Sequence, residues 1–144
     1  MRDQSSHFNP KMAIPPQAVL TNANTPYVSS IISVAGFDSL TFVILSGVNT
    51  DTNATFTALV EEGDSPTLTD AVPVADIDLA GTEALASFTA ANDDNKCFKI
   101  GYIGNRSYVR LTVTPAANDA GNAFVAAVAI LGNPRIKPTA NPPT

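Results

Sequence analysis

The sequence predicts an all-β protein, a single antiparallel β-sandwich or jelly-roll-like barrel with extended, proline-rich arms at its N- and C-terminal ends. Runs rich in β-branched and aromatic residues alternate with turn-forming clusters at close spacing, which is typical of antiparallel sandwiches. The chain has 144 residues, enough for one domain with a substantial core. Prolines interrupt both ends, and because proline cannot donate a backbone hydrogen bond, those ends fit neither a helix nor a central strand.

These observations divide the chain into three parts. Residues 1–26 form an extended N-terminal arm, residues 27–134 form the β-sandwich domain, and residues 135–144 form a C-terminal tail. A segment that proline already holds extended loses little entropy when it becomes ordered against a neighbour. We therefore expect both ends to contact other subunits.

Seven segments of the body are predicted as strands: residues 28–34, 39–46, 54–61, 84–89, 97–103, 107–114 and 123–131. In the sixth, Val109, Leu111 and Val113 alternate with polar residues, so one face of that strand is apolar. The second and third segments have the same period of two. The last segment is apolar on both faces, and its β-branched residues favour a strand in the centre of the sandwich over a helix. Residues 74–80 fit either a helical turn or a further strand.

Residues 97–114 are predicted to form a local β-hairpin. Gly104 and Asn105 lie between the two strands and accept the positive φ that a tight hairpin turn needs. This places Arg106 near the tip of the hairpin, and Tyr102 and Tyr108 where they can pair across it.

The charges are unevenly distributed along the chain. The net charge is −5, yet no Lys or Arg occurs between Lys11 and Lys96, an interval that holds eleven of the thirteen acidic residues. Residues 96–144 carry six cations and one acid, Asp119. If the acidic and basic parts lie on different faces, the molecule is electrostatically two-sided and suited to oriented contact with copies of itself or with a partner. The alternative is that a chain with few charges clusters them by chance.

The residues that nucleophilic catalysis needs are missing from the folded body. The one histidine, His7, lies in the N-terminal arm, where no packed group can orient it for a triad. The one cysteine, Cys97, can form neither an internal disulfide nor a thiolate metal cluster, and we expect it to be a small buried residue at the start of a strand.

Neighbouring carboxylates offer no clear catalytic or metal site either. The pairs Glu61-Glu62 and Asp93-Asp94 are explained as solvated turn or edge charges. A calcium-loop spacing that starts at Asp51 has Phe56 where the loop needs glycine. A weak surface cation site at residues 76 and 78 stays open, and phosphate-binding glycine loops are absent. We expect no enzymatic activity, no cofactor and no dedicated metal.

Basic and aromatic residues at 96–110 have the pattern of a single-strand nucleic-acid platform. The chain is acidic, however, and the aromatic residues follow the core period, so a protein contact explains the segment better and we expect no nucleic-acid partner. No apolar run is long enough to span a membrane, and the N-terminal segment lacks the layout of a signal peptide. We therefore expect synthesis in a cytoplasm and no membrane association.

Four sequence blocks carry a resemblance to a known group of proteins. They are AGFDSLTFVILSG (35–47), TFTALVEEGDSP (55–66), NKCFKIGYIGNRSYVRLTVTP (95–115) and AILGNPR (129–135). In this order they resemble small virion proteins of tailed bacteriophages that are encoded close to the major capsid protein. The GYIGNRSYVRL element is the most specific, although Ser107 stands where that group commonly has a basic residue.

The resemblance implies a capsid decoration, or cement, protein of β-sandwich type on the outer surface of the phage head. The implied partners are the major capsid protein and further copies of the chain, as a homo-oligomer such as a trimer. Neck or tail positions stay open, and the alternative is a virion surface module that binds host glycan. From exposure alone, the expected contact residues are Arg2, Phe8, Lys11, Ile14, Arg106, Tyr108, Arg110, Arg135 and Lys137.

Overall fold

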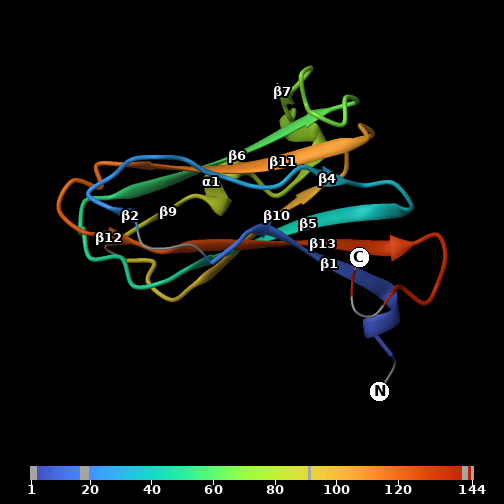
Figure 1. The fold of residues 1–144 in the computed structure, drawn as a ribbon, viewed down its shortest axis with the longest axis horizontal. Helices are drawn as coiled ribbons and strands as arrows, with labels where there is room; N and C mark the ends of the chain where they lie inside the picture. The colour runs from blue at the N-terminus through green and yellow to red at the C-terminus, as the bar shows by residue number, and fades with distance from the viewer. Residues whose placement is uncertain (1–2, 17–19, 91, 141–142, 144) are drawn as a thin grey trace.

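A computed structural model describes residues 3–16, 20–90, 92–140 and 143. Two antiparallel sheets pack face to face, which confirms the predicted all-β sandwich (Figure 1). In the described part of the chain, helical structure is limited to α1 (Glu83–Ala86) and the 3-10 turns η1 (Ser5–His7) and η2 (Asp76–Asp78).

One sheet has five strands among the described residues. Their order across the sheet is β1 (Phe8–Ile14), β13 (Val125–Pro134), β5 (Phe37–Ser46), β10 (Cys97–Tyr102) and β8 (Leu79–Ala80). The predicted strand at 123–131 is thus confirmed, and β13 lies between β1 and β5, inside the sheet as its composition indicated.

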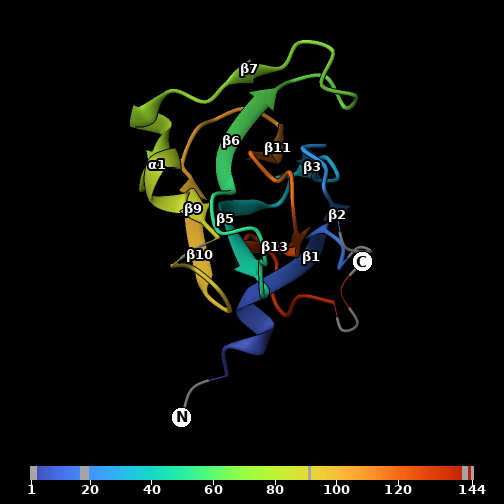
Figure 2. The same cartoon turned by 90° about the vertical axis from the view of Figure 1, so that its left-hand side faces the viewer.

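The other sheet is built around β6 (Thr55–Gly63) and β11 (Tyr108–Ala116). Within the described residues its remaining members are short: β3 (Tyr27–Val28), β4 (Ile32–Ser33), β7 (Val72–Pro73) and β9 (Phe88–Thr89). A small pair, β2 (Leu20–Thr21) with β12 (Asn122–Ala123), lies at one end of the sandwich. Figure 2 shows the two layers end on, with β6 and β7 in one layer and β13, β5 and β10 in the other.

The core lies between the sheets because every second residue of the long strands points inward. Phe42 and Ile44 of β5 and Phe56 and Val60 of β6 are almost completely buried. The alternation seen in the sequence therefore gave the correct inward face for these strands.

Both open sides of the sandwich are closed. On one side Ser29 donates its N–H to the Leu111 carbonyl at 2.8 Å and Ser30 donates its N–H to the Ala13 carbonyl at 3.0 Å, so this segment joins the two sheets. On the other side α1 packs between β6 and β10, and Glu83 accepts the N–H of Val60 at 2.7 Å.

The hairpin predicted for 97–114 is wrong. β10 pairs with β5 and β8, whereas β11 pairs with β6, β3 and β4, so residues 103–107 cross from one sheet to the other. A hairpin would pair β10 with β11 directly. Pairing β10 with β5 and β11 with β6 instead turns the apolar side of each strand toward the same core. Tyr102 and Tyr108 consequently belong to different sheets and do not pair across a turn.

The structure also bears on four local predictions. Residues 84–89 are not one strand, because the Thr82 side chain caps α1 by accepting the N–H of Leu85 at 3.2 Å, and the alanine-rich turn that follows favours a helix. Residues 28–34 split into β3 and β4, and residues 74–80 contain both the helical turn η2 and the short strand β8. Cys97 is exposed rather than buried, because it is in register with Leu45 on the outer side of its sheet.

The N-terminal segment differs from the detached arm that we expected. Its residues 8–14 form β1, which is an edge strand and can therefore contain Pro10. The C-terminal segment contacts it: Thr139 donates its N–H to the Ser6 carbonyl at 3.3 Å and its hydroxyl to the Phe8 carbonyl at 2.9 Å. The division of the chain at residues 26 and 135 stays a prediction.

Replacing Ile14 by alanine tests whether β1 belongs to the folded body. The Ile14 side chain is fully buried, so we expect the free energy of unfolding to fall by about 2–5 kcal/mol in urea denaturation. Met12→Ala in the same strand is the control, because that side chain is 57% exposed and its loss should change the free energy by less than about 0.5 kcal/mol. Equal effects of the two substitutions would show that β1 is not docked on the core.

Candidate functional site

Residues 103–107, which cross between the sheets, border an open hollow of about 380 Å³. Its other wall is the segment that leads into β5, with Gly36 and Asp38, and Arg135 completes the rim. The hollow brings together Arg106 and Arg135, two of the predicted contact residues. Residues 102–107 of the GYIGNRSYVRL element line this hollow.

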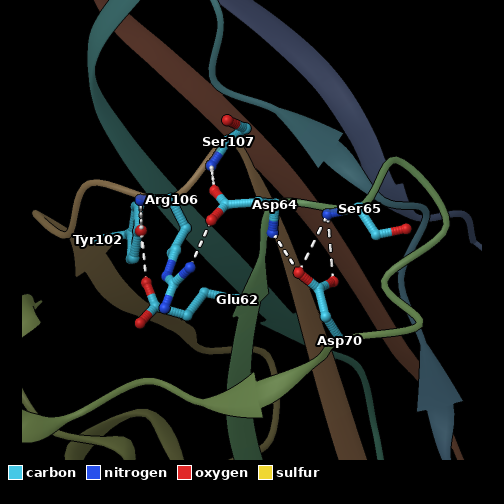
Figure 3. A network of polar contacts seen from close by, with 7 residues as sticks. All are labelled: Glu62, Asp64, Ser65, Asp70, Tyr102, Arg106 and Ser107. Carbon is cyan, nitrogen blue, oxygen red and sulfur yellow. Dashed lines mark hydrogen bonds and ion pairs between the residues drawn. The ribbon is translucent and has the colours of Figure 1, made fainter.

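A chain of hydrogen bonds fixes the crossing segment to the end of β6 (Figure 3). The Tyr102 hydroxyl donates to the Glu62 carboxylate at 2.5 Å and accepts the backbone N–H of Arg106 at 2.8 Å. Asp64 accepts from the Arg106 guanidinium and, at 3.3 Å, from the N–H of Ser107. Burial, followed by the hydrogen bond to Glu62, raises the pKa of the Tyr102 phenol above its ordinary value. The phenol therefore stays protonated and acts as a bridge between the two sheets.

Glycine is needed where this segment passes Tyr102. A Cβ atom at Gly104 would lie 2.6 Å from the phenol ring and from its oxygen, which is closer than carbon atoms approach in proteins. The glycine that looked like a hairpin signal thus serves a close approach of the backbone to a buried aromatic ring.

Asp70 organises the turn that follows β6. Its carboxylate accepts the N–H of Asp64 at 2.8 Å and that of Ser65 at 3.1 Å. The hydrogen bond from Asp64 holds the pKa of the Asp70 carboxyl below its ordinary value, and the Arg106 charge contributes a smaller part of the shift. Asp70 therefore positions the backbone that carries the carboxylate partner of Arg106.

Arg110 of β11 forms a second ion pair near the end of β6. It is opposite Glu61 in the register of β11 and β6, and its Nε and Nη2 donate to one Glu61 oxygen at 3.0 and 2.7 Å. Both side chains are partly buried on the outer side of the sheet. Cross-strand pairs of this kind stabilise the register by roughly 0.2–1 kcal/mol.

The ion pairs correct the expectation of an electrostatically two-sided molecule. Arg135 donates to Asp38 at 3.0 Å and Lys96 to Asp93 at 3.1 Å. With Arg106 and Arg110, four cations of the basic end are thus paired with carboxylates from the acidic middle of the sequence. The two parts of the sequence fold against each other instead of occupying separate faces.

Asp51, the first residue of the rejected calcium-loop spacing, also has a structural role. Its buried carboxylate accepts the N–H groups of Asp119 and Ala120, each at 2.8 Å. The bond from Ala120 holds the pKa of the Asp51 carboxyl below its ordinary value. Asp51 thereby joins two loops at the end of the sandwich.

The predicted contact residues fall into separate groups. Arg106 and Arg135 border the hollow, whereas Tyr108 and Arg110 lie half-buried on β11. Lys137 lies near Phe8 at the end of the sandwich, where its Nζ approaches His7 Nδ1 at 3.5 Å. Lys11 is half-buried on β1.

Two of the predicted contact residues need separate comment. Ile14 is a correction, because its side chain is in the core and cannot reach another molecule while the sandwich is folded. Arg2 lies outside the described residues. Contact through the other residues stays a prediction.

Sequence reasoning missed the carboxylates that hold these cations. Glu61 and Glu62 were interpreted as solvated charges and Asp64 was not considered, yet Glu61 and Glu62 are in register with β11 and Asp64 directly follows the end of β6. One signal could have predicted these ion pairs. The acidic residues and the basic residues lie in different parts of the sequence, and side chains that pair across neighbouring strands also come from different parts of a chain.

Within the residues that the structure describes, no group of three or more histidine, cysteine or acidic side chains could hold a metal ion. The same part of the chain contains no helix that is long and apolar enough to cross a membrane.

No protein-family model and no curated protein sequence matches the chain. Among solved structures it is similar to the PBSX exported protein XepA, with a TM-score of 0.50 and 12% identity over 88% of this chain and 38% of XepA. The chain thus spans less than half of the XepA chain. At this identity the likeness shows a shared fold.

Two further solved structures have lower scores. One is the CBM36-1 domain of a multidomain xylanase from the hindgut metagenome of Trinervitermes trinervoides, with a TM-score of 0.48 and 10% identity over 87% of this chain and 97% of that one. The other is the SPBc2 prophage-derived protein YomS, with a TM-score of 0.46 and 14% identity over 86% of this chain and 91% of that one. Neither score supports a conclusion about function.

Tyr102→Phe tests the bridge between the sheets. The substitution removes the donor to the buried Glu62 carboxylate and the acceptor of the Arg106 N–H, so we expect the free energy of unfolding to fall by about 1–3 kcal/mol. Tyr108→Phe, at the half-buried tyrosine of β11, should cost less than about 0.5 kcal/mol in the same denaturation series. A cost for Tyr102→Phe no larger than that of the control would contradict the bridge.

Asp70→Asn tests the role of the Asp70 carboxylate in the turn after β6 through the pH dependence of stability. Because the folded-state pKa is lowered, the ionised carboxylate stabilises the fold above its ordinary pKa of 3.8, and this contribution is lost as the pH falls through the folded-state value. The Asp70→Asn variant should therefore unfold at a lower urea concentration than the wild type at neutral pH. Between neutral and strongly acidic pH, its urea midpoint should fall less than that of the wild type. Asp76→Asn, on the exposed turn η2, is the control and should follow the wild-type curve.

Proposed function

We propose that this chain is a non-enzymatic structural protein of a tailed-bacteriophage virion, and specifically a capsid decoration protein that binds the outer surface of the head. The proposal starts from the four sequence blocks that resemble such proteins. The first block forms β5, the second β6, the third both β10 and β11, and the fourth the end of β13. These strands include the longest of both sheets. The sandwich fold shared with XepA agrees with the architecture that the resemblance implies.

The observation that carries the proposal is how these blocks are joined. Asp38 of the first block pairs with Arg135 of the fourth. Asp64 and Glu61 of the second block pair with Arg106 and Arg110 of the third. These charged side chains of the blocks therefore hold neighbouring segments of the two sheets together, which fits a structural role.

A stiff body of this kind suits the reinforcement of a shell. A head under internal genome pressure is strengthened when a small protein bridges neighbouring capsid subunits, because the bridge resists their separation. Such a protein needs area and shape more than a pocket. Among the predicted contact residues, Lys137 at the end of the sandwich near the half-buried Phe8, and Arg106 and Arg135 at the hollow, are exposed.

A second candidate is a virion surface module that binds host glycan. The observation that favours it is the open hollow, in which Asn105 and Arg106 present amide and guanidinium groups beside Phe37. Sugar sites combine such polar groups with an aromatic or apolar wall. A glycan array with the wild type and an Asn105→Ala variant tests this candidate, and glycan binding that is lost in the variant would favour it over the decoration role.

Cryo-electron microscopy of intact particles tests the decoration role. We expect density of this sandwich at regular positions on the outer face of the head. Its presence in the neck or tail alone would keep the virion role and overturn the decoration role, and its absence from particles would overturn both.

Lys137→Glu tests the predicted contact at the end of the sandwich. In rebinding of purified protein to heads that lack it, charge reversal at this site should weaken the apparent affinity by about fivefold or more. Lys96→Glu is the matched control, since it makes the same change at an exposed lysine just before β10, outside the predicted contacts, where only a surface ion pair to Asp93 is lost. A larger loss in the control than in Lys137→Glu would show that another face meets the head.

A further inference from the structure

The outer side of the five-stranded sheet, which we call the aliphatic face, is unusually apolar for a surface. The register places the following side chains on the outer side of the four longer strands: Phe8, Pro10 and Met12 of β1, Ala126, Val128, Ile130 and Gly132 of β13, Ser39, Thr41, Val43 and Leu45 of β5, and Cys97, Lys99 and Gly101 of β10. Antiparallel sheets with one solvated side usually alternate apolar-in and polar-out. Here both sides of β13 and much of β5 are apolar.

Some of these side chains are freely accessible. Met12 is 57% and Leu45 is 39% exposed, while Val43, Val128 and Ile130 are half-buried among their neighbours in the flat sheet. Lys99 is the one charged side chain on this face within the described strands, and it lies on β10, away from β13 at the centre. A long lysine stem can carry its ammonium group to the rim and keep it in water.

The opposite side of the molecule shows the contrast. On the outer side of β6 and β11 the described residues include Thr57, Thr112, Thr114 and the ion pair of Glu61 with Arg110. The long central strands of both sheets are of similar length, β5 and β13 in one and β6 and β11 in the other, so at the centre of each face the difference lies in the side chains. One outer face is suited to water and the other is not.

The aliphatic face continues into a hollow at the end of the strands. Pro16, Leu45, Phe124 and Ala126 line a depression of about 230 Å³, and Phe124 is 38% exposed. An exposed apolar surface of this extent, with a concave end, is typical of a protein contact.

We propose that the aliphatic face binds the aliphatic face of a second copy of this chain, so that two sandwiches stack as a two-fold dimer. This inference does not depend on the proposed function, because it concerns the free protein in solution. In such a dimer the two five-stranded sheets lie about 10 Å apart with their strands roughly aligned, as sheets do inside a single sandwich.

Self-complementarity is the first reason for choosing a second copy. A sheet face with aliphatic side chains across its centre matches itself without needing complementary charges, and a two-fold axis presents the same patch from both partners. A partner selected through charge would find only Lys99 on the described part of this face. The charge of the face thus argues against a strongly acidic or basic partner.

The area is the second reason. Four strands about 4.8 Å apart and seven residues long at about 3.4 Å per residue cover roughly 450 Å² in plane. Two copies therefore bring together roughly 900 Å², before side-chain relief and the Phe124 hollow are added, which is the size of specific but weak associations. We accordingly expect a dimer that dissociates on dilution.

Sedimentation analysis over a wide concentration series tests the proposal. We expect the wild type to pass from monomer to dimer, and Val128→Glu, which places a charge at the centre of the aliphatic face, to raise the dissociation constant by about a hundredfold or more. Leu59→Glu is the matched control, because it puts the same charge on a half-buried aliphatic position of β6 on the opposite outer face. The control should dimerise like the wild type, and circular dichroism checks that both variants are folded.

Cys97 provides a second measurement in the unmodified protein. It is the single cysteine of the chain, is exposed, and lies on the aliphatic face beside Leu45. Its rate of alkylation should fall as the wild type is concentrated into the dimer and should not depend on concentration in Val128→Glu.

Three results would overturn the inference. A wild type that stays monomeric throughout the series has no self-contact of this strength. A dimer that persists in Val128→Glu but is lost in Leu59→Glu uses the opposite face. If the wild type is monomeric and Val128→Glu loses binding to phage heads, the occupant of the aliphatic face is another virion protein, and the proposed function survives while this inference fails.

Discussion

The arrangement of the whole molecule depends on the crossing of residues 103–107 from one sheet to the other. Tyr102 and Asp64 hold this crossing from both sides, since the phenol binds Glu62 and the Arg106 backbone while Asp64 binds the Arg106 side chain. The crossing sends β10 to β5 and β11 to β6, so each long strand of the third sequence block extends a different sheet. Without it the two sheets would not enclose a common core at this end.

The strands that alternation predicted are largely correct, whereas the one strand pairing that was predicted, the hairpin of residues 97–114, is wrong. The period of two marks the inward face of β5, β6 and β11, because burial acts on each residue separately and leaves its trace locally in the sequence. Pairing depends on which strands can share one core, and that is a property of the whole chain. The Gly-Asn pair at 104–105 shows the difference: it looks like a hairpin turn, but its glycine is needed for contact with Tyr102.

The candidate site was predictable in its cations and not in their partners. Arg106, Arg110 and Arg135 were singled out as exposed contact residues, and each has a carboxylate partner within the chain. Ile14 was placed on the surface because prolines surround it, yet an edge strand tolerates proline and lets Ile14 reach the core. The aliphatic face escaped notice for a related reason: the apolar outer residues of β13 were interpreted as evidence of a central strand, although the described residues leave much of that side of the sheet partly exposed.

The contact of Thr139 with Ser6 and Phe8 makes the chain nearly circular. A short linker between these two segments would close the backbone into a ring, and new ends could be opened in the exposed loop around Pro66 and Thr67 without interrupting a long strand. Every strand pairing would then survive a change in the order of the sequence. Peptides attached beside Ser6 and beside Thr139 would lie next to each other at the same pole of the sandwich, which suits display of two different cargoes side by side.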